Sequence, residues 1–113
     1  MRVCIDVDGT ICITKAEHES YADVVPMPGA IETIKKLKEA GHYIIIATAR
    51  GMKTYESNLG KIVANQSTIL VNWLDKHDIP YDEIWFGKPL ADYYIDDKGF
   101  KFTDWKNVSD EIL

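Results

Sequence analysis

The stretch Val3-Cys4-Ile5-Asp6-Val7-Asp8-Gly9-Thr10 decides the fold that the rest of the chain must complete. Its first three residues form an apolar run that predicts a buried strand, and Gly9 marks the turn after it. Parallel α/β sheets bind their ligands at the carboxyl ends of their strands. The stretch therefore brings the carboxylates of Asp6 and Asp8 to a place where such a sheet binds ligands. A simple turn is the alternative explanation, because Asp and Gly are favoured turn residues.

Three later apolar runs also end on residues that can bind a phosphate or a metal. Residues 42–47 are followed by Thr48-Ala49-Arg50, residues 84–86 by Gly87-Lys88, and residues 93–95 by Asp96-Asp97. Each run is short, and β-branched or aromatic residues in it favour strand over helix. Four strands that end on such groups are hard to attribute to turn chemistry alone. The pattern predicts a polar site along one edge of the sheet.

The segments between the runs predict helices and one flap. Pro28 opens a helix in which Ile31, Ile34 and Leu37 recur at helical spacing, and Gly41 ends it. A second helical region lies between residues 54 and 77; its clearest part is 68–74, and Gly60 leaves the early part open. A closing helix runs from a cap at residue 103 or 104 to residue 112. Residues 11–27 have no clear helical period and predict a flap, a loose hairpin over the first strand end.

Composition limits the classes of protein that fit. One domain, residues 1–113, is expected from the length. The net charge of −5 argues against nucleic-acid binding, which needs clustered Lys and Arg. No signal peptide, membrane-spanning run or lipidation motif is visible, which predicts a cytoplasmic protein without a membrane partner. Cys4 is expected to pack in the core, and Cys4 and Cys12 are not expected to form a disulfide scaffold or a metal site.

The order D-x-D-G-T, Thr, Lys-Pro, Asp-Asp resembles the haloacid dehalogenase superfamily of phosphohydrolases. Residues 6–10 match its first motif, Thr48 the second, Lys88 the third, and Asp96-Asp97 the fourth. The resemblance extends from residue 3 to about residue 102. It implies an α/β fold of three layers, Rossmann-like, with a central, mostly parallel sheet. No large cap domain is expected, because neither interval between the motifs is long enough to hold one.

The resemblance also implies a mechanism in which Asp6 is the nucleophile and forms an aspartyl-phosphate. Asp8 would protonate the leaving alcohol and later deprotonate the attacking water. Thr48 and Lys88 would hold the phosphoryl oxygens, and the same loop would contact the substrate through Ala49 and Arg50. For Arg50, a role in gripping the substrate and a place as a surface cation are equally compatible with the sequence.

Mg²⁺ is the expected cofactor, because a hard cation takes oxygen ligands and often needs only one or two carboxylates. Its predicted ligands are Asp6, the backbone carbonyl of Asp8, and one of Asp96 and Asp97. The sequence does not tell which of the last two binds the metal and which holds Lys88.

A closer resemblance indicates a substrate class. The segments 28–31, 48–52, 73–74, 80–83 and 86–89 are similar to small phosphatase-like proteins found among capsule and surface-polysaccharide biosynthesis genes. This implies a small phosphorylated sugar or polyol as substrate. An uncapped site suits a large substrate or closure by a neighbouring subunit, so a homo-oligomer is expected.

Three other classes are weighed against this hypothesis. An uncapped protein phosphatase would use the same motifs, but no aromatic and basic peptide groove is evident. In a response-regulator receiver domain the acid pair comes first and Lys-Pro last, whereas here Asp96-Asp97 follows Lys88-Pro89. A non-catalytic phosphate-binding module would have no need for all four motifs.

Overall fold

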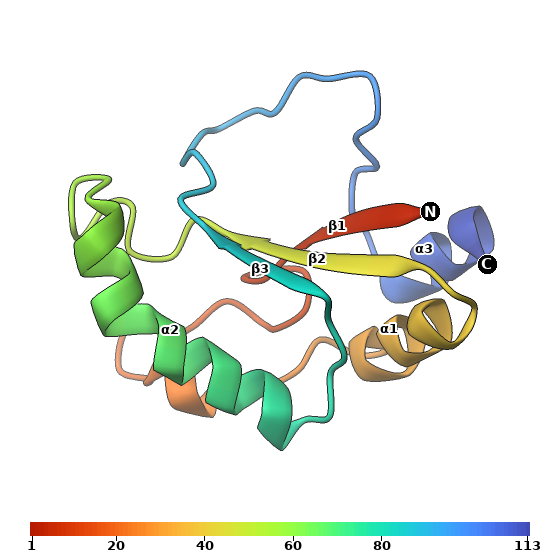
Figure 1. The fold of residues 1–113 in the computed structure, drawn as a ribbon, viewed down its shortest axis with the longest axis horizontal. Helices are drawn as coiled ribbons and strands as arrows, with labels where there is room; N and C mark the ends of the chain where they lie inside the picture. The colour runs from red at the N-terminus through yellow and green to blue at the C-terminus, as the bar shows by residue number, and fades with distance from the viewer.

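A parallel sheet of three strands forms the centre of the computed structural model, which describes all 113 residues (Figure 1). The strands are β1 (Arg2–Asp6), β2 (Tyr43–Thr48) and β3 (Glu83–Phe86), and they lie in that order. Asp6 of β1 aligns with Ala47 of β2, and Thr48 aligns with Phe86 of β3. All three strands therefore end at the same edge. This confirms the predicted α/β fold with a parallel sheet.

Two helices make the crossovers between the strands. Helix α1 (Ala30–Glu39) leads from β1 to β2, and α2 (Leu59–Lys76) leads from β2 to β3. Gly29, which precedes α1, has φ +83°, and a Cβ atom there would lie 3.0 Å from Cβ of Trp105. The helix therefore begins after this glycine, two residues later than the expected start at Pro28. Helix α2 begins at Leu59 and includes Gly60 in its first turn, whereas residues 54–57 of the second helical region form turns.

The helical cover lies on one face of the sheet. Burial alternates along β2: the side chains of Ile44 and Ile46 are buried, whereas those of Ile45 and Ala47 are only half-buried. Figure 1 shows α1 and α2 on the same side of the sheet, and the irregular segment between β3 and α3 (Trp105–Ile112) passing on the other. The face that carries Ile45 and Ala47 is therefore open.

The predicted fourth strand is not formed. Residues 87–104 contain no strand or helix, and Tyr93 and Ile95 are 84% and 95% exposed. The Tyr94 hydroxyl donates to the Pro89 carbonyl, and the Asp96 carboxylate accepts from two backbone N–H groups of the turn that follows it. The prediction is wrong because an apolar run becomes a strand only when a neighbouring strand pairs with it, and these local hydrogen bonds hold the run in a loop.

The segment 11–27 folds back on itself beside the strand ends. Its two ends pair antiparallel: Ile13 N–H donates to the Val25 carbonyl, and Met27 N–H donates to the Ile11 carbonyl, both at 2.8 Å. This agrees with the predicted loose hairpin. The Trp73 indole of α2 donates to the Val24 carbonyl at 2.9 Å, which ties the segment to the core. None of the helices has the length and apolar character that crossing a membrane requires.

Candidate active site

A cavity of about 600 Å³ lies where the three strands end. Its lining includes residues that follow each strand: Asp6 and Asp8 from β1, Arg50 from the β2 loop, and Lys88 from the β3 loop. The flap contributes Thr14, Lys15 and Tyr21, and the remaining lining residues are Ala49, Gly51, Lys53, Thr54, Leu90, Ala91 and Tyr94. Cavities of roughly 300–1,000 Å³ bind small molecules. The predicted edge of the sheet therefore carries a site of that size.

Asp6 and Lys88 meet in this cavity. Oδ1 of Asp6 lies 3.4 Å from Nζ of Lys88, and the two side chains are 34% and 27% exposed. The Lys88 N–H donates to the Thr48 carbonyl at 3.2 Å, which holds the lysine beside the end of β2. Gly87 has φ +90°, and a Cβ atom there would lie 2.5 Å from a methyl group of Leu59, so only glycine fits this turn. The fold thus brings an accessible carboxylate and a cation together, as the motifs predict.

Asp8 is held by Arg50. Nε of Arg50 donates to Oδ2 of Asp8 at 3.0 Å and Nη2 donates to Oδ1 at 3.1 Å, the two-pronged geometry that binds carboxylates most strongly. Arg50 is 3% exposed, and its guanidinium lies 4.2 Å from the centre of the Tyr21 ring. Nη1 has no hydrogen-bond partner in the chain. These contacts exclude the surface-cation alternative for Arg50 and show that it orients Asp8.

Thr48 and Ala49 lie at the end of β2. Thr48 is 1% exposed, and its Oγ1 accepts a hydrogen bond from the Arg50 N–H at 3.1 Å. This bond stabilises the turn that leads to Arg50, and Ala49 in that turn lines the cavity. Contact of either residue with a phosphoryl oxygen stays a prediction.

Asp96 and Asp97 are not brought to this cavity. Both are exposed, and neither lines it. Oδ1 of Asp96 accepts from the N–H groups of Lys98 and Gly99 instead. The chain has no group of three or more His, Cys, Asp or Glu residues placed to hold a metal. The predicted metal site, in which Asp96 or Asp97 joins Asp6 and the Asp8 backbone carbonyl, is therefore not assembled here, because it depends on the fourth strand.

Cys12 was not predicted to lie at the site, yet it contacts both members of the buried ion pair. Its Sγ lies 3.4 Å from Oδ1 of Asp8 and 3.8 Å from Nη2 of Arg50. Burial, and next the negative charge of Asp8, raise the pKa of the Cys12 thiol to about 12. Only its position just after the first motif could have indicated this placement. Cys4, in contrast, is exposed, which corrects the expectation that it packs in the core.

This contrast predicts selective alkylation. Iodoacetamide at pH 8 is expected to modify the exposed Cys4 slowly, because desolvation also raises the pKa of its thiol, and to leave Cys12 unmodified, because Cys12 is fully buried and burial raises the pKa of its thiol to about 12. Peptide mass spectrometry of the native protein measures both sites. Unfolding in urea before labelling is the control and should make both cysteines reactive. Equal labelling of the native protein would contradict the described packing of Cys12.

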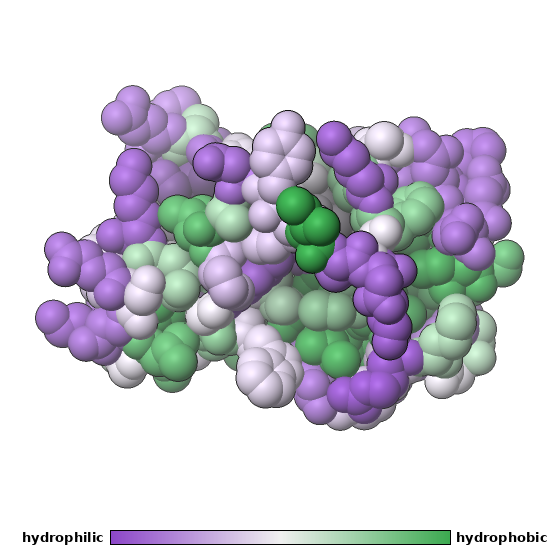
Figure 2. All heavy atoms as spheres, turned by 90° about the horizontal axis from the view of Figure 1, so that it is seen from above, coloured by the Kyte–Doolittle hydropathy of each residue, from purple (hydrophilic) through white to green (hydrophobic).

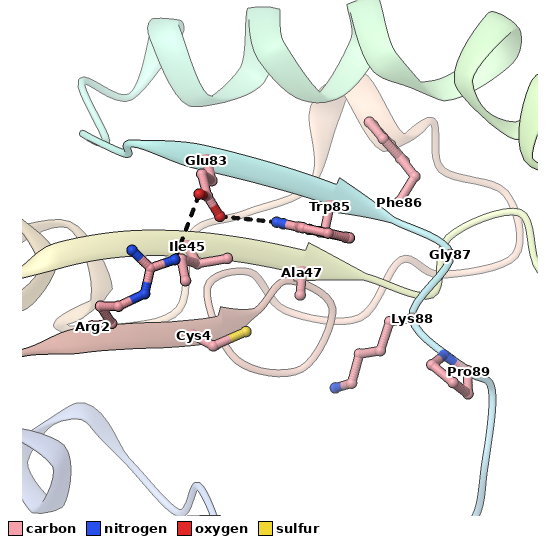
Figure 3. Close-up of a pocket in the computed structure, with 10 residues that line it drawn as sticks. All are labelled: Arg2, Cys4, Ile45, Ala47, Glu83, Trp85, Phe86, Gly87, Lys88 and Pro89. Atoms are coloured by element: carbon pink, nitrogen blue, oxygen red, sulfur yellow. Dashed lines mark hydrogen bonds and ion pairs between the residues drawn. The ribbon is translucent and has the colours of Figure 1, made fainter.

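A second cavity of about 390 Å³ lies on the open face of the sheet and shares Lys88 with the first. Figure 3 shows Cys4, Ile45, Ala47 and Trp85 projecting into it from the three strands. Seen from above, this face mixes apolar with strongly hydrophilic side chains (Figure 2). Glu83 is the only carboxylate in the lining, and it pairs with Arg2. Hydrogen bonds from the Trp85 indole and the Tyr43 hydroxyl hold the pKa of the Glu83 carboxyl below its usual range. The first cavity is therefore the one equipped for chemistry on a substrate.

Comparisons of sequence agree with the motifs. The family model of the haloacid dehalogenase-like hydrolases matches residues 3–72. A protein of Chlorobaculum tepidum that carries the provisional name 5'(3')-deoxyribonucleotidase is 35% identical over 85 residues. The match covers 72% of this chain and 39% of that protein. The chain thus spans about two fifths of the length of this relative.

Comparisons of structure agree with the fold. A crystal structure of a Vibrio cholerae protein has a TM-score of 0.78 and 41% sequence identity, and the match covers 84% of this chain and 78% of that chain. The D,D-heptose 1,7-bisphosphate phosphatase of B. bronchiseptica, complexed with magnesium and phosphate, has a TM-score of 0.51. It is 18% identical, and the match covers 75% of this chain and 48% of that chain, so it shows a similar fold.

Proposed function

Because the chain belongs to the haloacid dehalogenase-like hydrolases, we propose that it hydrolyses phosphate monoesters in the cavity at the strand ends. The observation that carries this proposal is the pair formed by the Asp6 carboxylate and the Lys88 ammonium group, 3.4 Å apart in that cavity. A carboxylate that solvent can reach is available as a nucleophile. The neighbouring cation compensates the negative charge of a phosphoryl group that approaches it.

In the proposed reaction, Asp6, Asp8 and Lys88 have the roles that the family motifs imply. An oxygen of Asp6 attacks phosphorus, the bond to the alcohol breaks, and an aspartyl-phosphate forms. Asp8 would give a proton to the leaving alcohol and later take one from the water that hydrolyses the intermediate. Because Arg50 holds Asp8 as a carboxylate in the structure, this role requires that Asp8 take up a proton when the substrate binds. The two hydrogen bonds from Arg50 keep Asp8 in one orientation throughout. Lys88, with Thr48 as a further donor, stabilises the charge on the transferred group.

We infer that Mg²⁺ is the cofactor, and the donors in the cavity fit it. Mg²⁺ is commonly held by one or two carboxylates, with waters and substrate phosphate completing its ligands. The Asp6 carboxylate and the backbone carbonyl of Asp8 would hold the ion: Asp6 lines the cavity, whereas both carboxylate oxygens of Asp8 accept hydrogen bonds from Arg50. Bound there, the ion would offset the repulsion between carboxylates and a phosphate dianion. Asp96 or Asp97 would join as a ligand only if the segment after β3 moved toward the free edge of β1.

For the substrate we propose a phosphorylated sugar or polyol of capsule or surface-polysaccharide biosynthesis, in the cytoplasm. The segments shared with phosphatase-like proteins of those gene clusters support this, as does a cavity of about 600 Å³ without a cap domain over it. A second copy of the chain is the proposed cover for the open site. A deoxyribonucleoside monophosphate is the second candidate, favoured by the name of the Chlorobaculum tepidum relative.

Phosphate release from a panel of sugar, polyol, deoxynucleotide and peptide phosphates tests these proposals. We expect release of phosphate from a sugar or polyol phosphate in the presence of Mg²⁺. Excess chelator should lower the rate at least about 10²-fold, because the ion contributes several kcal/mol of stabilisation to the charge that develops in the transition state. Release from deoxynucleotides alone would support the second candidate, and release from phosphopeptides alone a protein phosphatase. No release from any member, with the protein folded, would overturn the proposed hydrolysis and favour a phosphate-binding module.

A further inference from the structure

We propose that the same cavity holds a second anion-binding site, formed by Thr14-Lys15 and Lys53-Thr54. The substrate would then be a phosphate ester that carries a second anionic group, either a carboxylate or another phosphate. This inference rests on the proposed phosphatase function, and it narrows the substrate class within it.

The lining of the cavity carries cations that no carboxylate neutralises. Four cationic side chains and two carboxylates line the cavity. Lys88 pairs with Asp6, and Arg50 pairs with Asp8. Lys15 and Lys53 form no ion pair with any carboxylate of the chain, although the whole chain has a net charge of −5. Two unpaired cations in one cavity of an acidic protein attract an anion.

Lys15 and Lys53 lie in two different loops, and each has a hydroxyl donor beside it. Lys15 lies in the flap, where its ammonium group donates to the Ala16 carbonyl at 3.2 Å and lies 5.4 Å from the centre of the Tyr21 ring. Lys53 lies in the turns that follow β2. Each lysine is next to a threonine that also lines the cavity, so two ammonium groups and two hydroxyls are available as donors. Such donors bind carboxylate or phosphate oxygens in charge-assisted hydrogen bonds.

The cavity is larger than one phosphoryl group. A phosphoryl group between Asp6 and Lys88 fills only a small part of a cavity of about 600 Å³. Tyr94 lies against Lys88, whereas Lys15, with Tyr21 beside it, and Lys53 belong to the remaining lining. The carbon chain of a substrate can therefore extend from the phosphoryl position toward the two lysines.

Three six-carbon phosphate esters that differ only at C1 test the inference. D-Glucitol 6-phosphate has a hydroxyl group there, 6-phosphogluconate a carboxylate, and D-glucitol 1,6-bisphosphate a second phosphate. We expect kcat/KM to be at least about 10-fold higher for one or both of the doubly anionic compounds, the effect of one charge-assisted contact. The double variant Lys15→Gln/Lys53→Gln should reduce that ratio to near one, mainly through KM. Lys61→Gln on α2, outside the cavity, is the control and should leave the ratio unchanged.

Binding to the Asp6→Asn variant, measured by calorimetry at fixed ionic strength, separates the two hypotheses. Tighter binding of a doubly anionic compound than of D-glucitol 6-phosphate supports the second site if the difference disappears when Lys15→Gln and Lys53→Gln are added to Asp6→Asn. This holds even if the wild type hydrolyses none of the three compounds. That result, together with no turnover of any compound of the wider phosphate panel, would overturn the proposed function alone. Turnover of all three at equal kcat/KM, with equal affinities, would overturn the second site and leave the phosphatase. A gain confined to 6-phosphogluconate would identify a sugar acid phosphate, and a gain confined to the bisphosphate a second phosphate.

Discussion

Replacing Asp6 with Asn is expected to lower kcat for phosphate release by about 10⁴-fold or more, the order of loss seen when a covalent nucleophile is removed. The amide has nearly the same shape as the carboxylate but is a far weaker nucleophile, so the covalent intermediate cannot form at a useful rate. Lys88 remains in place to bind the phosphoryl group. Substrate affinity should therefore fall much less than kcat.

The fold should tolerate the Asp6→Asn change. The Asp6–Lys88 pair is partly exposed, at 34% and 27%, and exposed ion pairs contribute about 1 kcal/mol or less to stability. Urea denaturation of the variant should thus give a midpoint close to that of the wild type. Asp75→Asn, an exposed carboxylate of α2, is the matched control and should keep full activity. Retention of more than a tenth of the wild-type kcat in Asp6→Asn would contradict the nucleophile assignment.

Replacing Asp8 with Ala is expected to destabilise the protein by about 3 kcal/mol, because it leaves a buried guanidinium without its carboxylate. The Arg50 side chain is fully buried, whereas that of Asp8 is 26% exposed. Removal of the arginine by Arg50→Met should therefore cost less, about 1–2 kcal/mol, since water can solvate the remaining carboxylate. The loss of the Tyr21 contact is included in that smaller figure.

Urea denaturation of both single variants and of Asp8→Ala/Arg50→Met measures this asymmetry. The double variant should be less destabilised than the sum of the single ones, because the stranded charge is gone. Asp110→Ala, which breaks the exposed Lys106–Asp110 pair, is the control and should change stability by about 0.5 kcal/mol or less. A larger loss in Arg50→Met than in Asp8→Ala would show that Asp8, rather than Arg50, is the group that depends on the pair.

Sequence reasoning predicted Asp6, Asp8 and Lys88 at one edge of the sheet because strand ends in a parallel sheet share an edge. It failed for the strand predicted at 93–95, because this run lies in an exposed loop and does not pair with the free edge of β1 or of β3. For Arg50 it left two alternatives. Burial at 3% exposure and the paired contacts with Asp8 decided between them.

What the sequence by itself determined is the α/β fold and the family, with two carboxylates and a lysine where the strands end. These features depend on residue periodicity, turn residues and motif order, all of which are local. Only the tertiary structure decided the Asp8–Arg50 pair, which joins residues 42 positions apart, the placement of Lys15 and Lys53 in one cavity, and the open face of the sheet. The physical reason is that loop packing brings together side chains whose separation in sequence carries no signal of their contact.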